Sequence, residues 1–267
     1  MSKSDALAFC QQFATSPAAP DDWPGISRGS LSASLTARLN NPDLIHQKST
    51  SLCGPASFVR AIAIDMPLNY VRCAIDLYRT GRGNIVNLDI APHRRFKRSP
   101  PKMGTDAADW IMMGSLRDDE NLIFSVANTP GLVAGMTLPR AMAKWFKNAG
   151  YTNVSDQAHI AWWPESSRLW AARYASNLHS AGYKVVMLID ADVMNPVKQD
   201  SDRINVPNHW VTLTSPIFTK ATMHLAEPVS FWVYSWGGRK QIPYYATIPV
   251  TLSRFLQKFY GFVAAKL

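Results

Sequence analysis

The chain has 267 residues, 47% of them hydrophobic, and carries a formal net charge of +9. This composition is that of a chain able to bury a substantial core, and it excludes a membrane-spanning helix because nowhere do about 18 apolar residues follow one another. The positive charge predicts an acidic partner or surface, with anionic protein, phospholipid, cell-wall polymer and nucleic acid all left open.

The three cysteines, Cys10, Cys53 and Cys73, are few and unevenly spaced. Neither a disulfide framework nor a four-ligand zinc site is therefore predicted, and a thiol outside a disulfide suits a reducing compartment. The first residues, MSKSDALAFCQQF, contain no apolar run of the length found in signal peptides. We expect synthesis in the cytoplasm without a signal peptide, which leaves delivery to another cell by a contact-dependent secretion system open.

The N-terminal part of the chain combines one helical pattern with a stretch rich in Pro, Gly and Ser. Residues 4–14 predict a short amphipathic helix. Residues 15–45 predict an extended arm, because repeated Pro and Gly interrupt regular structure. We accordingly expect residues 1–43 to form an N-terminal extension that packs on a single domain comprising residues 44–267.

The segment around Cys53 has the pattern of a helix start. Gly54 and Pro55 follow the cysteine directly, and an apolar run over residues 58–66 comes next. A thiol at this position is exposed to the positive end of the helix dipole, which favours the nucleophilic thiolate. Six residues earlier, Gln47 carries an amide that can donate a hydrogen bond to an oxyanion. The alternative is a buried structural cysteine.

Further helices are predicted between this segment and the first strand. Their expected ranges are 67–79 ending near Gly81, 105–118 with Thr105 as N-cap, 138–148 and 166–181, and a strand follows at 184–190. The basic run over residues 92–102 contains an aromatic and can grip phosphates, but a solvated loop is the commoner use of such a run. No specific nucleic-acid motif surrounds it.

Strands dominate the C-terminal part. Residues 208–213 combine aromatic and β-branched side chains and predict a strand that begins at His209. A hairpin leads to a second strand over 229–236, followed by a strand or extended segment at 241–248, a helix at 251–259 and a closing strand at 260–265. Helices that precede a mostly antiparallel sheet define the α+β class.

Gln47, five intervening residues and Cys53-Gly54 resemble the oxyanion and nucleophile segment of papain-like cysteine peptidases. Cys-Gly-Pro-Ala-Ser at 53–57 resembles the bacterial branch of this fold, which includes bacteriocin-leader peptidases, phytochelatin synthases and effector toxins. His209 has the place of the general base, since the family's histidine opens a central strand after the nucleophile. The resemblance covers about residue 44 to the C-terminus through three short motifs, and it implies a papain-like fold with the nucleophile helix in the helical half.

Ser-Trp-Gly at 235–237 resembles the Asn-Ser-Trp-Gly of papain-like enzymes, in which the Asn orients the histidine. Tyr234 stands at the position of the Asn, which puts the third catalytic member in doubt. In the register of the bacteriocin-leader peptidases the match is Ser235, whose hydroxyl can hold an imidazole tautomer more weakly than a carboxylate. Ser235 is our prediction, with Tyr234, Glu227 and Asp190 as the alternatives.

These residues predict a cysteine-dependent amide hydrolase, a peptidase that needs no cofactor and no metal. Cys53 attacks the carbonyl, His209 moves the proton, and Gln47 binds the oxyanion. The resemblance implies a secreted bacterial effector toxin with a protein or peptide substrate and an immunity protein or secretion-system partner. The alternatives are a glutamine deamidase or transglutaminase-like effector, a cell-wall peptide amidase, and a binding module that has lost activity.

Overall fold

The computed structural model of the chain describes residues 2–16, 23–102, 104–123, 136–161, 163–194, 205–218, 220, 222–243 and 249–267. The chain divides into two compact units. The first contains Met1–Thr129, Trp145–Gly150 and Trp236–Gly238, and the second contains Pro130–Lys144, Tyr151–Ser235 and Arg239–Leu267. No helix within the described ranges is long and apolar enough to cross a membrane.

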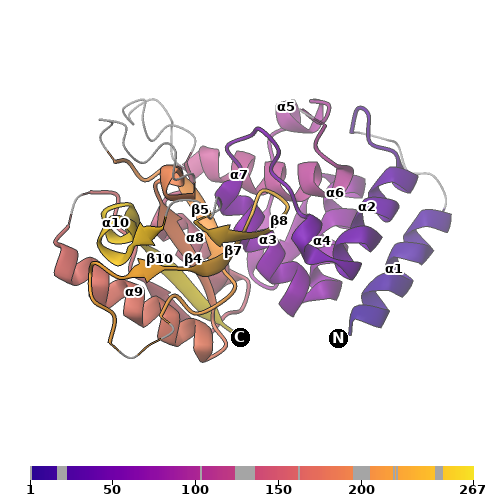
Figure 1. Cartoon of the computed structure of the whole chain (residues 1–267). Coiled ribbons are helices and arrows are strands. Elements are labelled where there is room, and N and C mark those ends of the chain that lie inside the picture. Colours follow the sequence, from indigo (N-terminus) through magenta and orange to yellow (C-terminus); the bar gives the residue numbers. More distant parts are fainter. Residues whose placement is uncertain are drawn as a thin grey trace. The chain divides into compact units, whose positions relative to one another are not determined.

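The first unit is mainly helical (Figure 1). Its helices are α1 (Lys3–Thr15), α2 (Arg28–Asn40), α3 (Cys53–Asp65), α4 (Pro67–Thr80), α5 (Arg94–Lys97), α6 (Ala107–Asp109) and α7 (Ser115–Ile123). A 3₁₀ turn, Pro42–Leu44, precedes α3, and a π-helical turn, Trp110–Gly114, joins α6 to α7. Two short strands, β1 (Gly83–Ile85) and β2 (Leu88–Ile90), pair as an antiparallel hairpin.

Helix α2 corrects the prediction of an extended arm over residues 15–45, which is wrong for residues 28–40. The Ser27 hydroxyl caps the helix by accepting a hydrogen bond from the Ser30 N–H, and the Ser30 hydroxyl accepts one from the Ser27 N–H, which forms a capping box. Leu31, Leu35 and Leu39 recur every four residues and are buried. The helix packs against α1, which also packs against α4 (Figure 1).

The helix predicted at residues 105–118 exists but starts and ends elsewhere. Its N-cap is Asp106 rather than Thr105, and the helical segment runs through the π-helical turn to Ile123. The Thr105 hydroxyl donates to the Lys102 carbonyl at 2.6 Å, and the Asp106 carboxylate binds Arg38 instead of the helix amides. The predicted end of α4 is confirmed, since Gly81 adopts the left-handed conformation with φ of 72°.

The basic run at residues 92–102 contains the short helix α5 and is anchored by one aromatic side chain. Phe96 packs between Trp23 and Trp110, with ring centroids 5.8 and 5.0 Å away. Gly114 makes room for this ring, because a Cβ there would lie 2.2 Å from the Phe96 ring. The cations Arg94, Arg95, Arg98 and Lys102 are exposed, as expected for a solvated segment.

The second unit is built on a six-stranded sheet in the order β3-β10-β4-β5-β7-β8. The strands are β3 (Asn153–Asp156), β4 (Lys184–Ile189), β5 (His209–Leu213), β7 (Phe231–Ser235), β8 (Gly238–Ile242) and β10 (Phe259–Lys266), with β6 (Pro228–Val229) and β9 (Val250–Thr251) forming a separate pair. The four pairings from β3 to β7 are antiparallel. Helices with a mostly antiparallel sheet confirm the α+β class, whereas β3 was not predicted and residues 244–248 of the expected strand lie outside the described residues.

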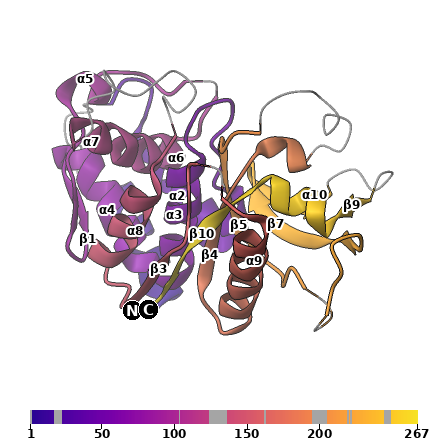
Figure 2. The same ribbon diagram turned by 90° about the vertical axis from the view of Figure 1, so that its left-hand side faces the viewer.

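Helices α9 (Glu165–Ser180) and α10 (Leu252–Gln257) cover one face of this sheet, and α8 (Pro139–Asn148) precedes them (Figure 2). Small side chains on α9 let that helix approach the strands closely. The buried cluster includes Ala171, Ala172 and Ala175 from α9 and Val185, Met187, Ile189, Val211 and Leu213 from β4 and β5. Register pairs Met187 with Val211 and Ile189 with His209, so His209 starts β5 on the face that α9 covers.

Candidate active site

Cys53 is the first residue of α3, where the sequence predicts a helix start. Its side chain is nearly buried, with 7% of the residue exposed. Leu52 at the N-cap supplies no side-chain hydrogen bond to the first turn, and the Ala56 N–H closes the helix on the Leu52 carbonyl at 2.8 Å. A thiol at this end of a helix lies where backbone N–H groups and the helix dipole favour negative charge.

Gln47 lies in a tight turn that leads to α3. The residue is 7% exposed, and its carbonyl accepts the Thr50 N–H at 3.2 Å. Lys48 adopts a positive φ of 53°, an uncommon conformation for a residue with a side chain. Its N–H donates to His46 Nδ1 at 2.7 Å, which holds the turn in that conformation. Local hydrogen bonds therefore fix the backbone on both sides of Gln47.

His209 and Ser235 form a buried hydrogen bond, with 2.7 Å between Nε2 and Oγ. Strand register explains why Ser235 rather than Tyr234 meets the ring. Thr212 pairs with Tyr234 and Leu213 with Val233, so continuing the register sets Ser235 opposite position 211. Because side chains alternate between faces, Ser235 shares the face of His209 and Tyr234 points to the other.

The two acidic alternatives are engaged elsewhere. Asp190 accepts the N–H groups of Asp192 and Val206 at 3.0 and 3.2 Å, and it lies 3.8 Å from the Lys258 ammonium. Glu227 accepts the His224 N–H at 3.2 Å and lies 3.6 Å from the ammonium of Lys220. In the described part of the chain, neither carboxylate is bonded to His209.

Burial lowers the pKa of His209 to about 4. The imidazole is therefore neutral near pH 7, the state that a general base needs. In the tautomer whose Nε2 proton is donated to the Ser235 oxygen, Nδ1 carries the lone pair that accepts a proton. Because the Ser235 hydroxyl adds no negative charge, this hydrogen bond does not oppose the effect of burial on the pKa of His209.

Gln47 and Cys53 belong to the first unit, and His209 and Ser235 to the second. The structure brings His209 and Ser235 together, and the pairing of Cys53 with His209 stays a prediction. No protein-family model, curated protein or solved structure matches this chain significantly. Across the residues that the structure describes, no group of three or more His, Cys, Asp or Glu side chains is arranged to hold a metal ion.

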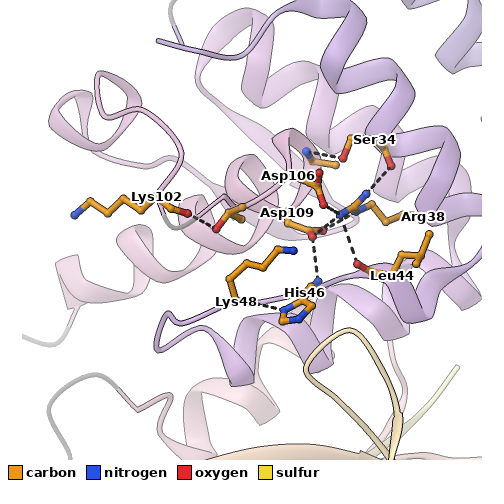
Figure 3. Close-up of polar contacts among 10 residues, drawn as sticks. Ser34, Arg38, Leu44, His46, Lys48, Lys102, Asp106 and Asp109 are labelled. Atoms are coloured by element: carbon orange, nitrogen blue, oxygen red, sulfur yellow. Dashed lines mark hydrogen bonds and ion pairs between the residues drawn. The ribbon is translucent and has the colours of Figure 1, made fainter.

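Two residues beside Gln47 were not predicted from the sequence. Arg38 and Asp109 form a buried ion pair, and Asp109 also accepts the His46 N–H at 3.0 Å (Figure 3). A sequence signal does exist. Asp109 interrupts the run Ala107 to Met113 with a charge, and a charge among residues that pack a core needs a buried partner.

We expect iodoacetamide near pH 7 to label Cys53 at least about 10-fold faster than Cys10 or Cys73. Burial raises the pKa of Cys10 to about 11 and raises that of Cys73 as well, and both residues are 0% exposed. Peptide mapping by mass spectrometry over a time course measures the three rates. A Cys10→Ser, Cys73→Ser variant is the control and should label at the wild-type rate. Equal rates at all three cysteines would contradict an activated Cys53.

We also expect His209 to make stability depend on pH. Its pKa in the folded protein, about 4, lies below the ordinary 6.5, so the unfolded chain takes up the proton first and stability falls as pH drops through this window. Relative to pH 7.5, the free energy of unfolding falls by about 2 kcal/mol at pH 5 and by about 3 kcal/mol below pH 4. Urea unfolding at pH 7.5 and 5 should show this dependence in the wild type and not in His209→Gln. The exposed His224→Gln control should behave as the wild type, and identical pH dependence in all three proteins would refute the expectation.

Proposed function

We propose that the protein is a cysteine-dependent amide hydrolase of the papain-like type. The observation that carries this proposal is the buried hydrogen bond between His209 and Ser235, which orients an imidazole that burial keeps neutral near pH 7. In the proposed tautomer, Nε2 donates to Ser235 and Nδ1 is the proton acceptor. The position of Cys53 at the first residue of α3 supports it. In this proposal Cys53 is the nucleophile, His209 the base, and Gln47 an oxyanion donor.

The reaction proceeds through a thioester. The Cys53 thiol gives its proton to His209 Nδ1 as sulfur attacks the carbonyl carbon, and the oxyanion is bound by the Gln47 side-chain amide and the Cys53 N–H. His209 then passes the proton to the leaving amine as the carbon–nitrogen bond breaks. Water, deprotonated by His209, releases the acid and restores the thiol.

The same thioester intermediate serves peptide hydrolysis, deamidation of a glutamine side chain and transfer to an amine. Among these three reactions we propose peptide hydrolysis. The bacterial Cys-Gly-Pro-Ala-Ser motif supports an effector toxin with a protein or peptide target and an immunity or secretion partner. The net charge of +9 suits an acidic target.

A second candidate is a binding module that retains the fold without catalysis. The specific observation that favours it is the uncharged partner of His209, since a hydroxyl orients the ring without stabilising an imidazolium. A chain that only binds needs no imidazolium. The two candidates differ in whether Cys53 forms a covalent acyl intermediate.

An activated ester such as p-nitrophenyl acetate tests this directly. We expect wild-type protein to release p-nitrophenolate with an acetyl group added to Cys53 by mass spectrometry, and Cys53→Ala and His209→Ala each to abolish both signals. The combined variant should cost little more than either change alone, because residues that act as one unit are non-additive. Acetylation that is independent of His209, or absent from Cys53, would favour the binding module.

Ser235→Ala should slow acetylation of Cys53 by about 10-fold to 100-fold, equivalent to about 1.4–2.7 kcal/mol of barrier. The hydroxyl orients the ring but carries no charge, so its removal costs less than loss of the base. The matched control is Ser230→Ala, an exposed serine that instead binds Gln241 at 2.6 Å and should leave the rate unchanged. An unchanged rate in Ser235→Ala would remove Ser235 from the site.

A further inference from the structure

A buried guanidinium organises the polar contacts next to the predicted oxyanion donor. Arg38, from α2, is 4% exposed and donates to both oxygens of Asp109, with distances of 2.8 Å from Nε and 2.6 Å from Nη2 (Figure 3). Nη2 also lies 2.6 Å from Asp106, whose side chain is 54% exposed. This is the two-pronged geometry that makes an arginine–carboxylate pair strong and directional.

The Arg38 guanidinium stays charged although it is buried. Burial lowers the pKa of Arg38, but the hydrogen bonds and charge of Asp109 outweigh burial and raise that pKa above its ordinary value. Burial raises the pKa of Asp109, and Arg38 and the His46 N–H oppose that rise. Asp109 and Asp106 both lie at hydrogen-bond distance from the guanidinium and stabilise its charge.

The same carboxylate reaches the segment that carries Gln47. Asp109 Oδ2 accepts the His46 N–H at 3.0 Å, and Arg38 Nη2 lies 3.5 Å from the Leu44 carbonyl (Figure 3). His46 directly precedes Gln47 in the chain. The ion pair therefore holds the backbone one residue before the predicted oxyanion donor.

The His46 ring is fixed as well. Its Nδ1 accepts the Lys48 N–H, and the backbone of Gly237 lies against the ring so closely that a Cβ there would be 2.3 Å from His46 Cδ2. Gly237 also has a positive φ of 69°, which favours glycine. With His46 held through its backbone and its ring, and Lys48 held through His46, Gln47 lies between two fixed neighbours.

We propose that Arg38 and Asp109 are positioning residues for Gln47, which rests on the proposed function. An apolar pair of similar size would pack α2 against α6 without the cost of burying two charges. Such an apolar pair would not supply an acceptor for the His46 N–H, whereas the Asp109 carboxylate does. Displacing an oxyanion donor by about 1 Å is enough to cost about 100-fold in rate.

The test compares Asp109→Asn with Asp106→Asn. Both carboxylates lie 2.6 Å from Arg38, but only Asp109 binds the His46 N–H among the contacts in Figure 3. Asparagine keeps only one acceptor oxygen, so its NH2 group must face either an Arg38 N–H or the His46 N–H, and the set of contacts cannot be kept. We therefore expect Asp109→Asn to slow acetylation of Cys53 by p-nitrophenyl acetate by about 10-fold to 100-fold. Alkylation by iodoacetamide should change less than about 3-fold, since displacement at a saturated carbon forms no oxyanion. Asp106→Asn should stay within about 3-fold of the wild type in both reactions.

Two further measurements separate positioning from general stability. In a Gln47→Ala background, Asp109→Asn should slow acetylation of Cys53 by less than about a further 3-fold, because the side chain that Asp109 positions is absent. Backbone hydrogen exchange over residues 44–50 should accelerate in Asp109→Asn and not in Asp106→Asn. If Asp109→Asn does not fold, Arg38→Lys takes its place, since lysine keeps the charge but loses the two-pronged contact, and the same split between acetylation and alkylation is expected.

The outcomes distinguish the two proposals. Wild-type protein that is not acetylated at Cys53 removes the proposed function and this inference with it. Cys53-dependent acetylation that Asp109→Asn leaves intact overturns the positioning role alone. A loss that is as large in the Gln47→Ala background, or equally large for alkylation, also overturns it, because the effect would not pass through the oxyanion donor.

Discussion

The first unit depends on a buried ion pair that joins segments far apart in the sequence. Arg38 and Asp109 are separated by 71 residues, and their contact connects α2, the helix that contains the π-helical turn, and the segment before α3. Removing one partner of such a pair leaves an uncompensated buried charge, at a cost of about 3–5 kcal/mol. The π-helical turn begins directly after Asp109, and π turns inside helices are frequent at functional sites. In the proposed positioning role, stability of the first unit and placement of Gln47 depend on the same contact.

The second unit depends on strand parity. Alternation along β5 and β7 puts His209 and Ser235 on the same face, and a shift by one residue would bring Tyr234 there instead. Register is strongly fixed in this sheet because the face that carries His209 is packed against α9, where Val211 and Leu213 are buried. The hydrogen bond of the histidine is therefore a consequence of core packing as much as of local sequence.

Elements with a strong local signal were predictable, and those set by tertiary contacts were not. The start of α3 at Cys53, the stop of α4 at Gly81 and the strand at His209 follow from Pro, Gly and β-branched patterns. Helix α2 was missed because serines occur in loops as readily as at helix caps. Burial of its leucines, which the sequence alone does not show, is what favours the helix. The N-cap is Asp106 instead of Thr105, and its carboxylate binds Arg38, 68 residues away, rather than the helix amides. The contact of Ser235 with His209 was predictable from a motif, whereas that of Asp109 with His46 had no motif to indicate it.

An uncharged partner for His209 shifts the demands of the proposed reaction to other groups. A carboxylate partner would stabilise by its charge the imidazolium that forms in the proposed reaction. The Ser235 hydroxyl carries no such charge, and burial lowers the pKa of His209 to about 4. His209 then rests as a neutral imidazole. In the proposed reaction, stabilisation of negative charge must come from the start of α3 and from oxyanion donors. Under that constraint the donor has to be held accurately, because little else lowers the barrier. An uncharged partner for His209 therefore makes the proposed reaction depend more on an accurately held Gln47, which the contacts of His46 and Lys48 supply.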